Sequence, residues 1–502
     1  MLPVLNSEQA RTLDEFTISN EPIASIDLME RAALACTNWI AERFDANTTF
    51  TALAGPGNNG GDALAISRLL IKRGFQVNVF SAASIDRLSD DARTNHERLK
   101  GIGVETKVIT TVSDVDFGDD TVVIDGLFGS GLNRAIGGLP AAVIDKLNNS
   151  ASRVVSIDVP SGLPADREPY SGCVVQADYT LKLGLPCMSL FDPDAEKFVG
   201  HWQLLDIGLL YHLWEGAEVD FQYLDSIATY SGFFGRSKHA YKNQMGRVLL
   251  IGGSHQMPGA IQMALRGALK AGAGLVHAHV PSRVALPVQV NFPEVICTVD
   301  KCADYITSVP DVDKYDVVAF GPGAGLHPDT VGALGDLIHQ QPKHLILDAD
   351  GLNILSSHPH LMDKLPKQTI LTPHIGEFRR LTNVSHKNFY ERIEALKFFT
   401  ENHNCIVVLK GAYTAMACAG KPIVFNSTGN PGMATGGMGD ALTGIITGLL
   451  GQCKDPIVAT LCGVFIHGLA GDMAADEIGP IGLLPTDLLQ LVPKAIKQAF
   501  AK

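Results

Sequence analysis

Hydrophobic residues recur at two spacings in the first half of the chain. Ala10, Leu13 and Phe16 follow Ser7 at helical spacing, and we interpret Ser7 as the cap of that helix. The elements expected next are a helix over 25–43, an apolar β-prone run over 49–54, a glycine-rich turn over 55–61, a helix over 63–73 and a strand over 75–80. The order strand, glycine turn, helix, strand predicts a parallel sheet.

Two further apolar runs in this half each end in an aspartate. The run 121–125 ends at Asp125, and the run 153–158 ends at Asp158 and continues into Pro-Ser-Gly. In open parallel sheets the ligand crevice lies at the carboxyl ends of the strands. Two carboxylates and one glycine loop at such ends therefore indicate a binding site, although a single Asp could equally cap a turn.

A second α/β series begins at Arg247, after a segment over 205–234 in which the pattern weakens. We interpret that segment as a linker or domain-swap region. The strands expected in the second series are RVLLI before Gly252, 274–280, 316–320, 345–348 and 406–410. The two halves share an α/β architecture without a residue-level repeat, which predicts a two-domain protein.

Composition narrows the function classes. The chain has 502 residues, of which 46% are hydrophobic and 19% charged, and its net charge is −13. Nucleic-acid binding is disfavoured, but an acidic protein can still bind anionic nucleotides through backbone N–H groups and helix N-termini. Nine cysteines without a CxxC pair indicate reduced thiols in a cytoplasmic protein. We expect no signal peptide and no membrane-spanning run of about 18 apolar residues.

The turn after the first strand, GPGNNGGD, contains GxGxxG. The dinucleotide-binding form of this motif needs an acidic residue about twenty positions later, where this chain has Ser81. The turn is also unusually polar for a bare phosphate loop. It therefore indicates a nucleotide-related site other than that of a hydride-transferring dehydrogenase; a purely structural turn is the alternative.

The segment 429–442, GNPGMATGGMGDAL, precedes an apolar helical stretch over 443–450. Gly436, Gly437 and Gly439 would place backbone N–H groups at a helix start, where they can bind phosphate or a developing oxyanion. Asp440 falls in the first helical turn, where the helix dipole favours its ionised form. We expect Asp440 to accept a proton from a substrate hydroxyl. The chain has no GxxxxGK[ST], HExxH or paired CxxC, so a P-loop and a zinc site are not expected.

Residues 1–210 resemble the NAD(P)H-hydrate epimerase family in Leu28-Met29-Glu30, GPGNNGGD, DGLFGSG and IDVPSG. The resemblance implies a Rossmann-like three-layer sandwich, epimerisation at C6 of hydrated nicotinamide, and Asp158 as an acid or base. It implies a potassium ion held by Asn59, Asp125 and Ser161. The hydrate contacts it implies are Asn58, Asn59, Gly60, Gly61, Asp62, Gly129, Ser130, Gly131, Leu132, Asn133, Arg134, Ala135 and Asp158. The chain departs from the family at Ala63, a common glycine position, and at Cys187, where many relatives carry lysine.

Residues 235–500 resemble the ribokinase-like ADP- or ATP-dependent NAD(P)H-hydrate dehydratases. The motifs are IGGS, PGA, GPGAG, LDAD, LTPHIGE, LKGAYT and the Gly436–Asp440 loop. The resemblance implies phosphorylation of the C6 hydroxyl by ADP or ATP with magnesium, and then loss of phosphate. Hydrate contacts are expected at Ala260, Gly323, His374 and Asp440. Nucleotide contacts are expected at Lys410, Gly411, Ala412, Tyr413, Thr414 and Gly439.

Taken together, the resemblances imply a lyase and isomerase that repairs NADHX and NADPHX. The epimerase domain would span 1–215 and the dehydratase domain 228–502, in a cytoplasmic homo-oligomer that uses ADP in preference to ATP. One alternative is a ribokinase-like kinase for a small hydroxylated metabolite, fused to a nucleotide-binding module. Another is an N-terminal half that senses nucleotides without catalysis. The intact glycine loop and both strand-end aspartates argue against the second.

Overall fold

The computed structural model describes residues 1–118, 120–132, 134–166, 172–214 and 219–501. The chain forms two compact units, Leu2–Val219 and Asp220–Lys502, which we call the N-terminal and C-terminal units. The division falls inside the segment expected to be a linker, yet part of that segment forms the strand Phe221–Leu224.

The N-terminal unit is built on an all-parallel sheet with the strand order β4-β3-β2-β5-β6-β7-β8. The strands of this sheet are β2 (Thr49–Ala54), β3 (Gln76–Ser81), β4 (Thr106–Val108), β5 (Thr121–Gly126), β6 (Arg153–Ile157), β7 (Tyr179–Leu183) and β8 (His201–Leu205), and the two-residue strand β1 (Leu2–Pro3) is not part of it. Its helices are α1 (Ser7–Asn20), α2 (Ser25–Arg43), α3 (Asn58–Lys72), α4 (Asp90–Gly101), α5 (Gly138–Asn148) and α6 (Glu196–Val199).

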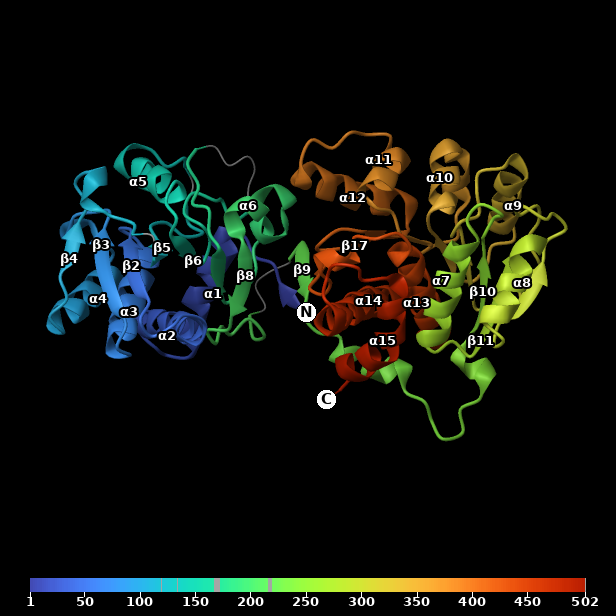
Figure 1. Cartoon of the computed structure of the whole chain (residues 1–502), viewed down its shortest axis with the longest axis horizontal. Helices are drawn as coiled ribbons and strands as arrows, with labels where there is room; N and C mark the ends of the chain where they lie inside the picture. The colour runs from blue at the N-terminus through green and yellow to red at the C-terminus, as the bar shows by residue number, and fades with distance from the viewer. Residues whose placement is uncertain (119, 133, 167–171, 215–218, 502) are drawn as a thin grey trace. The chain divides into compact units, whose positions relative to one another are not determined.

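Two hydrophobic cores enclose this sheet. One joins α2, α3 and α4 to one face, and the other joins α5 to the opposite face, as the blue and teal helices in Figure 1 show. Strands covered on both faces are apolar along most of their length, which is why β2 and β5 have almost uniformly buried residues. The expected Rossmann-like three-layer sandwich is confirmed.

Two local predictions in this unit were wrong. The cap of α1 is Asn6, whose side chain accepts from the Gln9 backbone N–H at 2.8 Å, while the Ser7 hydroxyl turns to the carbonyl of Ser130 at 2.8 Å. The turn expected over 55–61 is shorter, because α3 already begins at Asn58. Gly60 permits this early start: a β-carbon there would overlap the carbonyl of Gly55.

The C-terminal unit contains a larger mixed sheet in which β9-β18-β17-β16-β15-β14-β13-β10-β11-β12 are neighbours in that order. β17 is antiparallel to both neighbours, and the other neighbouring strands in this order are parallel. The strands are β9 (Phe221–Leu224), β10 (Arg247–Ile251), β11 (Leu275–Val280), β12 (Ile296–Val299), β13 (Val317–Phe320), β14 (Leu345–Leu347), β15 (Ile370–Leu371), β16 (Ile406–Leu409), β17 (Ala415–Cys418) and β18 (Ile423–Asn426).

Helices cover both faces of this second sheet. The helices are α7 (Pro258–Lys270), α8 (Ser282–Asn291), α9 (Pro328–His339), α10 (Asp350–Ser357), α11 (Ile375–Thr382), α12 (Phe389–His403), α13 (Met438–Cys453), α14 (Pro456–Ile478) and α15 (Pro485–Ala499). α7, α13, α14 and α15 share one core, and Figure 1 shows α9 to α12 on the opposite side. Gly444 lets α13 approach α7 closely, since a β-carbon there would overlap the carbonyl of Ala264.

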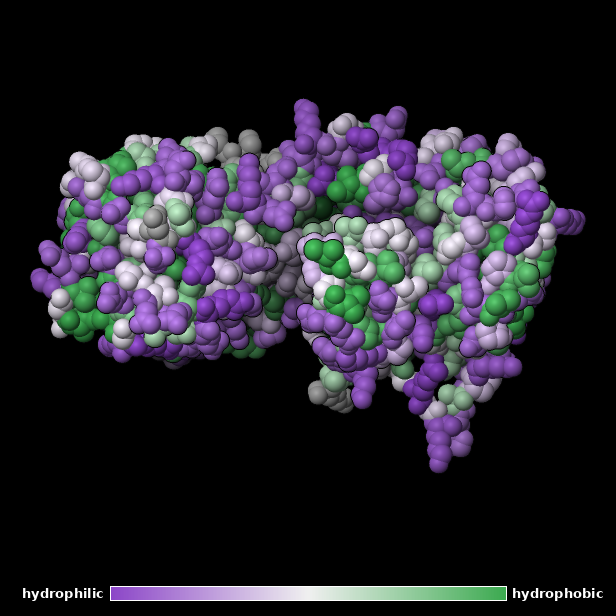
Figure 2. All heavy atoms as spheres, viewed as in Figure 1, coloured by the Kyte–Doolittle hydropathy of each residue, from purple (hydrophilic) through white to green (hydrophobic). Residues whose placement is uncertain are grey.

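One helix, α14, is long and apolar enough to cross a membrane by length and composition alone. α14 has a window with a mean hydropathy of 1.6, but 78% of that window is buried inside the unit. Its burial among α13 and α15 is that of a core helix in a soluble protein. Figure 2 shows hydrophilic residues with several hydrophobic groups among them on the visible face, one of these near α14. Ile478, at the end of α14, and Ile481 are exposed.

Candidate active sites

The candidate site of the N-terminal unit lies at the carboxyl ends of β2, β5 and β6, where the sequence places its polar loops. α3 carries Asn59 in its first turn and Asp62 just after it, and both are buried. Gly129, in the loop after β5, packs against the Asn59 amide, because a β-carbon there would lie 3.2 Å from Asn59 Cγ. The glycine loop before α3 and the loop after β5 therefore meet at this edge of the sheet.

Asp125 at the end of β5 is fully buried and hydrogen-bonded to the loop after β6. The Ser161 hydroxyl donates to Asp125 Oδ1 at 2.5 Å, and the Ser161 backbone N–H donates to Oδ2 at 2.9 Å. The Phe128 backbone N–H donates to Ser161 Oγ at 2.8 Å. The oxygen-bearing residues expected to bind a cation thus surround one short stretch of backbone, Phe128 and Gly129.

Asp158, directly after β6, has a left-handed backbone with φ +66°, which is uncommon for a residue other than glycine. Its Oδ2 accepts from the Ser130 backbone N–H at 3.1 Å, and its Oδ1 is ion-paired with Lys182 of β7. Burial alone would raise the pKa of Asp158. The Lys182 ammonium and the Ser130 hydrogen bonds outweigh burial and hold that pKa below its ordinary value.

The charge of Asp158 raises the pKa values of two more carboxyl groups. Burial, and then the charge of Asp158, raise the pKa of Asp14 in α1 to about 6. Burial, followed by the charges of Asp158 and Asp14, raises the pKa of Asp62 well above its ordinary range. Asp62 therefore favours its protonated form more than an ordinary aspartate does, whereas Asp158 favours its ionised form. Neighbouring carboxyl groups whose pKa values are pushed apart are suited to proton transfer.

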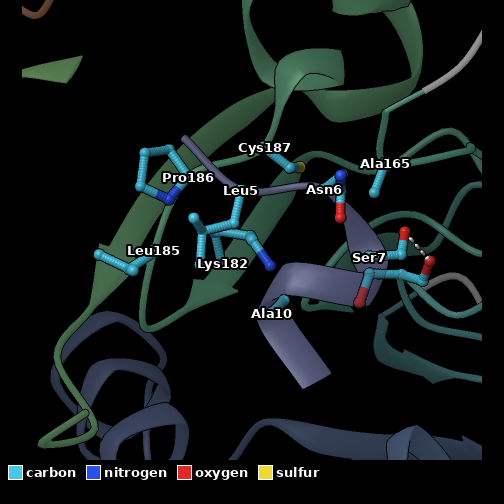
Figure 3. Close-up of a pocket in the computed structure, with 10 residues that line it drawn as sticks. Leu5, Asn6, Ser7, Ala10, Ala165, Lys182, Leu185, Pro186 and Cys187 are labelled. Atoms are coloured by element: carbon cyan, nitrogen blue, oxygen red, sulfur yellow. Dashed lines mark hydrogen bonds between the residues drawn. The ribbon is translucent and has the colours of Figure 1, made fainter. Parts of the chain in front are cut away.

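A pocket beside Asp158 is lined by ten residues of the N-terminal unit: Leu5, Asn6, Ser7, Ala10, Ser130, Ala165, Lys182, Leu185, Pro186 and Cys187. Figure 3 shows Lys182 extending from its strand towards the first turn of α1, with Cys187 above it in this view. Ser7 closes the pocket by bonding to Ser130 and, through its backbone N–H at 2.7 Å, to Asp166 Oδ2. Residues far apart in the sequence thus form one polar wall.

The remaining residues that were predicted to contact the hydrate have no described hydrogen bond to Asp158. Asn58, Gly131, Arg134 and Ala135 are exposed, and no described hydrogen bond joins them to Asp158. Leu132 donates its backbone N–H to the Gly129 carbonyl at 3.2 Å, which shapes the loop. Asn133 lies outside the described residues.

The candidate site of the C-terminal unit lies at the N-terminus of α13. Gly437 precedes the helix with φ +93°, and Asp440 is in its first turn, as the glycine-rich segment predicts. The helix begins at Met438, five residues before the apolar stretch from which it was predicted. Free backbone N–H groups at such an end attract an anion.

Lys410, which follows β16, is the centre of a buried charge cluster. Its Nζ lies 3.0 Å from Asp348 Oδ1 and 3.9 Å from Glu377 Oε2. Asp348 also accepts from the Thr443 hydroxyl of α13 at 2.7 Å. Burial would lower the pKa of Lys410, but Asp348 and Glu377 raise it, so the ammonium stays charged. The cluster ties the ends of β14 and β16 to α13.

Asp440 differs from the sequence-based expectation of a carboxylate whose ionised form is favoured. Burial and the nearby charge of Asp348 raise its pKa to about 7, although Lys410 opposes the shift. These effects exceed the helix dipole, which contributes less than burial at such a site. A carboxyl with a pKa near neutrality is well matched to general-base catalysis.

The other predicted residues of this unit fall around the same edge. His374 caps α11 through its Nδ1, which accepts from the Gly376 N–H at 2.9 Å, and it forms a β-bridge with Lys410. Gly323 packs against Ala260, because a β-carbon at Gly323 would lie 3.0 Å from Ala260 Cβ. A β-carbon at Gly439 would lie 3.1 Å from Lys410 Nζ. Residues 411–414 form the turn into β17, which leaves Gly411 and Ala412 exposed.

Sequence reasoning missed several residues of these sites. Lys182 stands in an apolar strand, and the alternation in LKL was the only signal for it. Asp14 reads as an ordinary polar residue of an amphipathic helix. Asp348 and Glu377 lie within the motifs LDAD and LTPHIGE but were given no role of their own. All four are identified by tertiary contacts.

The comparisons with known proteins cover both units. Residues 248–494 match the family model described as NAD(P)H-hydrate dehydratase, and residues 25–188 match that of the YjeF-related protein N-terminus. The C-terminal unit is similar to the solved structure of ADP/ATP-dependent NAD(P)H-hydrate dehydratase from Bacillus subtilis co-crystallized with ATP/Mg2+. That similarity has 30% identity and a TM-score of 0.47, and it covers 53% of this chain and 94% of that one.

Whole-length relatives carry one common name. The bifunctional NAD(P)H-hydrate repair enzyme Nnr of Moorella thermoacetica is 35% identical over 97% of this chain and 95% of its own length. The enzyme of that name from Escherichia coli K12 is 32% identical over 94% of this chain and 89% of its own length. The chain therefore belongs to the family of bifunctional NAD(P)H-hydrate repair enzymes.

Proposed function

We propose that the protein repairs hydrated nicotinamide cofactors at two separate sites. The N-terminal domain, 1–215, would interconvert the R and S epimers of NADHX and NADPHX. The C-terminal domain, 228–502, would dehydrate the S epimer at the expense of ADP or ATP. The observation that carries this proposal is the Asp440 carboxyl in the first turn of α13. Its pKa is about 7, and it lies beside the ion pair of Lys410 and Asp348.

In the dehydratase reaction, Asp440 takes the proton of the substrate's C6 hydroxyl as the hydroxyl oxygen attacks the terminal phosphoryl group. The backbone N–H groups at the start of α13 and the Lys410 ammonium stabilise the charge that develops on the phosphate. The C6–O bond then breaks, phosphate leaves with the bonding electrons, and loss of the C5 proton restores the double bond. Magnesium enters as the complex of the nucleotide co-substrate.

In the epimerase reaction, ionised Asp158 accepts the proton of the C6 hydroxyl. The C6–N1 bond opens to an aldehyde, and its electron pair moves to N1, which is conjugated with the carboxamide. Rotation about the C5–C6 bond and closure on the other face invert C6, and Asp158 returns the proton. Asn59, Ser130 and Asp62 line the same edge of the sheet and would contact the hydrate.

The coupled assay tests both halves together. The purified chain is incubated with hydrated NADH as the S epimer, the R epimer or the mixture, with ADP or ATP and magnesium. Recovery of absorbance at the reduced-nicotinamide band from both epimers supports the proposal. A stable phosphorylated small metabolite with no cofactor recovery would instead support the ribokinase-like kinase. R epimer that converts no faster than it does unaided would contradict the epimerase.

A potassium ion fits the residues proposed to hold it. Asn59, Asp125, Ser161 and the Phe128 carbonyl offer hard oxygen ligands. The Asn59 Nδ2 is buried and has no hydrogen-bond partner among the described residues; with the amide turned over, its oxygen would occupy that position as a ligand. The ion would neutralise Asp125 and fix the loops that carry Ser130 and Asp158.

Potassium removal is therefore expected to slow epimerisation. Replacing potassium chloride by tetramethylammonium chloride at equal ionic strength should lower the rate, because the large organic cation cannot enter a site of this size. Asp125→Asn should weaken the apparent potassium affinity by at least about tenfold, because it removes the ligand charge. Equal rates in the two salts for the unaltered protein would contradict the assignment of the site.

A cytoplasmic location fits the nine free cysteines. The preference for ADP over ATP and the homo-oligomer stay predictions, which the coupled assay and light scattering respectively would test.

A further inference from the structure

Lys182 occupies a position that a lysine rarely takes. It lies in the interior of β7 between Leu181 and Leu183, and it is 5% exposed. Burying an ammonium group is costly unless a partner of opposite charge and good geometry compensates. The structure provides that partner in Asp158, whose Oδ1 forms the ion pair.

The sheet register fixes this pairing. β6 and β7 are parallel, and Ile157 lies opposite Leu181. Asp158 and Lys182 are the next residues after this pair in the two segments. The Asp158 backbone N–H donates to the Leu181 carbonyl at 2.8 Å, which continues the ladder to this point. The Asp158 backbone then turns left-handed, and the Lys182 ammonium and Ser130 N–H hold the carboxylate from two sides. The strained conformation is thus stabilised by contacts to the group expected to do the chemistry.

Cys187 gives a second, independent observation. Its position is the one at which the family resemblance leads us to expect a lysine, and its side chain lines the same pocket as Lys182. The two are close enough that each affects the electrostatics of the other. A chain with a thiol at 187 therefore still has an ammonium in this pocket, which comes from five residues earlier.

We propose that Lys182 is the positioning residue of the epimerase site, where its ammonium takes the place of a lysine absent at 187 and holds the Asp158 carboxylate against the Ser130 amide. The proposal rests on the epimerase function proposed above. The other titratable groups that face this pair are Asp14 of α1, Asp62 of α3, Cys36 of α2 and Cys187 of the loop after β7, and Asp166 acts on Cys187.

The first test is the pH profile of epimerisation by Lys182→Thr. Without the ammonium, the burial of Asp158 is opposed mainly by the Ser130 hydrogen bonds, so its pKa rises. The acid limb of kcat should move to higher pH by at least about one unit. At neutral pH kcat should fall about 100-fold, with a smaller change in KM. A uniform loss at every pH would indicate a merely structural lysine and overturn the proposal.

The second test moves the lysine. The double variant Lys182→Thr/Cys187→Lys restores one ammonium to the pocket from the other position. We expect the double variant to epimerise at least about tenfold faster than Lys182→Thr. Its acid limb should lie closer to that of the unaltered protein. Lys182→Arg should also regain part of the rate, because it keeps the charge in a bulkier group. A folded double variant as slow as the single one would overturn the replacement of the lysine at 187.

Matched controls separate these outcomes from misfolding. Lys146→Met removes another partly buried lysine of the same unit, whose Nζ donates to the Val115 carbonyl, and it should leave epimerisation unchanged. The dehydratase rate of each preparation reports its concentration of intact chain. If the unaltered protein fails to epimerise, the proposed epimerase function itself is contradicted. If Lys182→Thr epimerises at the unaltered rate, only the role of Lys182 is contradicted.

Discussion

Asp440→Asn is expected to lower the kcat of the dehydratase by about 100-fold to 10 000-fold, because an amide cannot take up the proton of the substrate hydroxyl. The substitution is nearly isosteric and keeps the first turn of α13. Binding of the hydrate should therefore change less than turnover. The measurement is recovery of reduced cofactor from the S epimer at saturating nucleotide.

The pH profile gives this prediction a second test. The pKa of Asp440 is raised to about 7, and only the ionised form is a base. In the unaltered protein the rate should therefore rise with pH through 7 and fall about tenfold for each unit below it. The residual rate of Asp440→Asn should lose that dependence. A variant that retained the same acid limb would assign the titration to another group.

The epimerase activity of the same preparation is the internal control. Asp440 belongs to the C-terminal unit, so R to S conversion should continue at the unaltered rate. Parallel loss of both activities would instead indicate a folding defect. A dehydratase rate within about threefold of the unaltered protein would contradict the assignment of Asp440 as the base.

Asp158→Asn is expected to lower the epimerase kcat by at least about 100-fold, since it removes the carboxylate that accepts the hydroxyl proton. Asparagine is the better choice for this position because it tolerates the left-handed conformation, with φ +66° at Asp158, more readily than alanine does. The measurement is the rate of R epimer loss above its unaided rate. Asp158→Asn at the unaltered rate would contradict this role of Asp158.

Asp178→Asn is the matched control for this variant. Asp178 precedes β7 at the opposite edge of the sheet, where its carboxylate accepts from the Val154 backbone N–H at 2.7 Å. Its loss should affect stability and leave the epimerase rate unchanged. The pKa of Asp158 is lowered, so its base form is present down to acid pH and the unaltered protein should keep its epimerase rate below pH 6. The dehydratase, whose base has a pKa near 7, should lose rate first as the pH falls.

The pKa of the catalytic carboxyl is therefore shifted in opposite directions at the two sites. At Asp158 a buried ammonium outweighs burial and keeps the carboxylate ionised. At Asp440 burial and Asp348 outweigh Lys410, and the carboxyl titrates near neutrality. Both carboxyls were predicted as catalytic, but the direction of each shift depends on which neighbour is nearer, which the tertiary structure decides.

The sequence by itself determined the features that depend on local patterns. Alternation, apolar runs and glycine turns predicted the parallel sheets and placed Asp125 and Asp158 at strand ends. The glycine-rich segment before an apolar stretch placed Asp440 in the first turn of a helix. Such features follow from side-chain periodicity and backbone freedom over a few residues, so they can be predicted without knowledge of the fold.

Only the tertiary structure decided which distant side chains meet. Lys182 pairs with Asp158 because β6 and β7 lie in parallel register, and Lys410 pairs with Asp348 because β14 and β16 end at the same edge. The cap of α1 is Asn6 and not the predicted Ser7, because the Ser7 hydroxyl is hydrogen-bonded to the Ser130 carbonyl. Register, burial and long-range hydrogen bonds depend on the whole packed core, and no short segment of sequence encodes them.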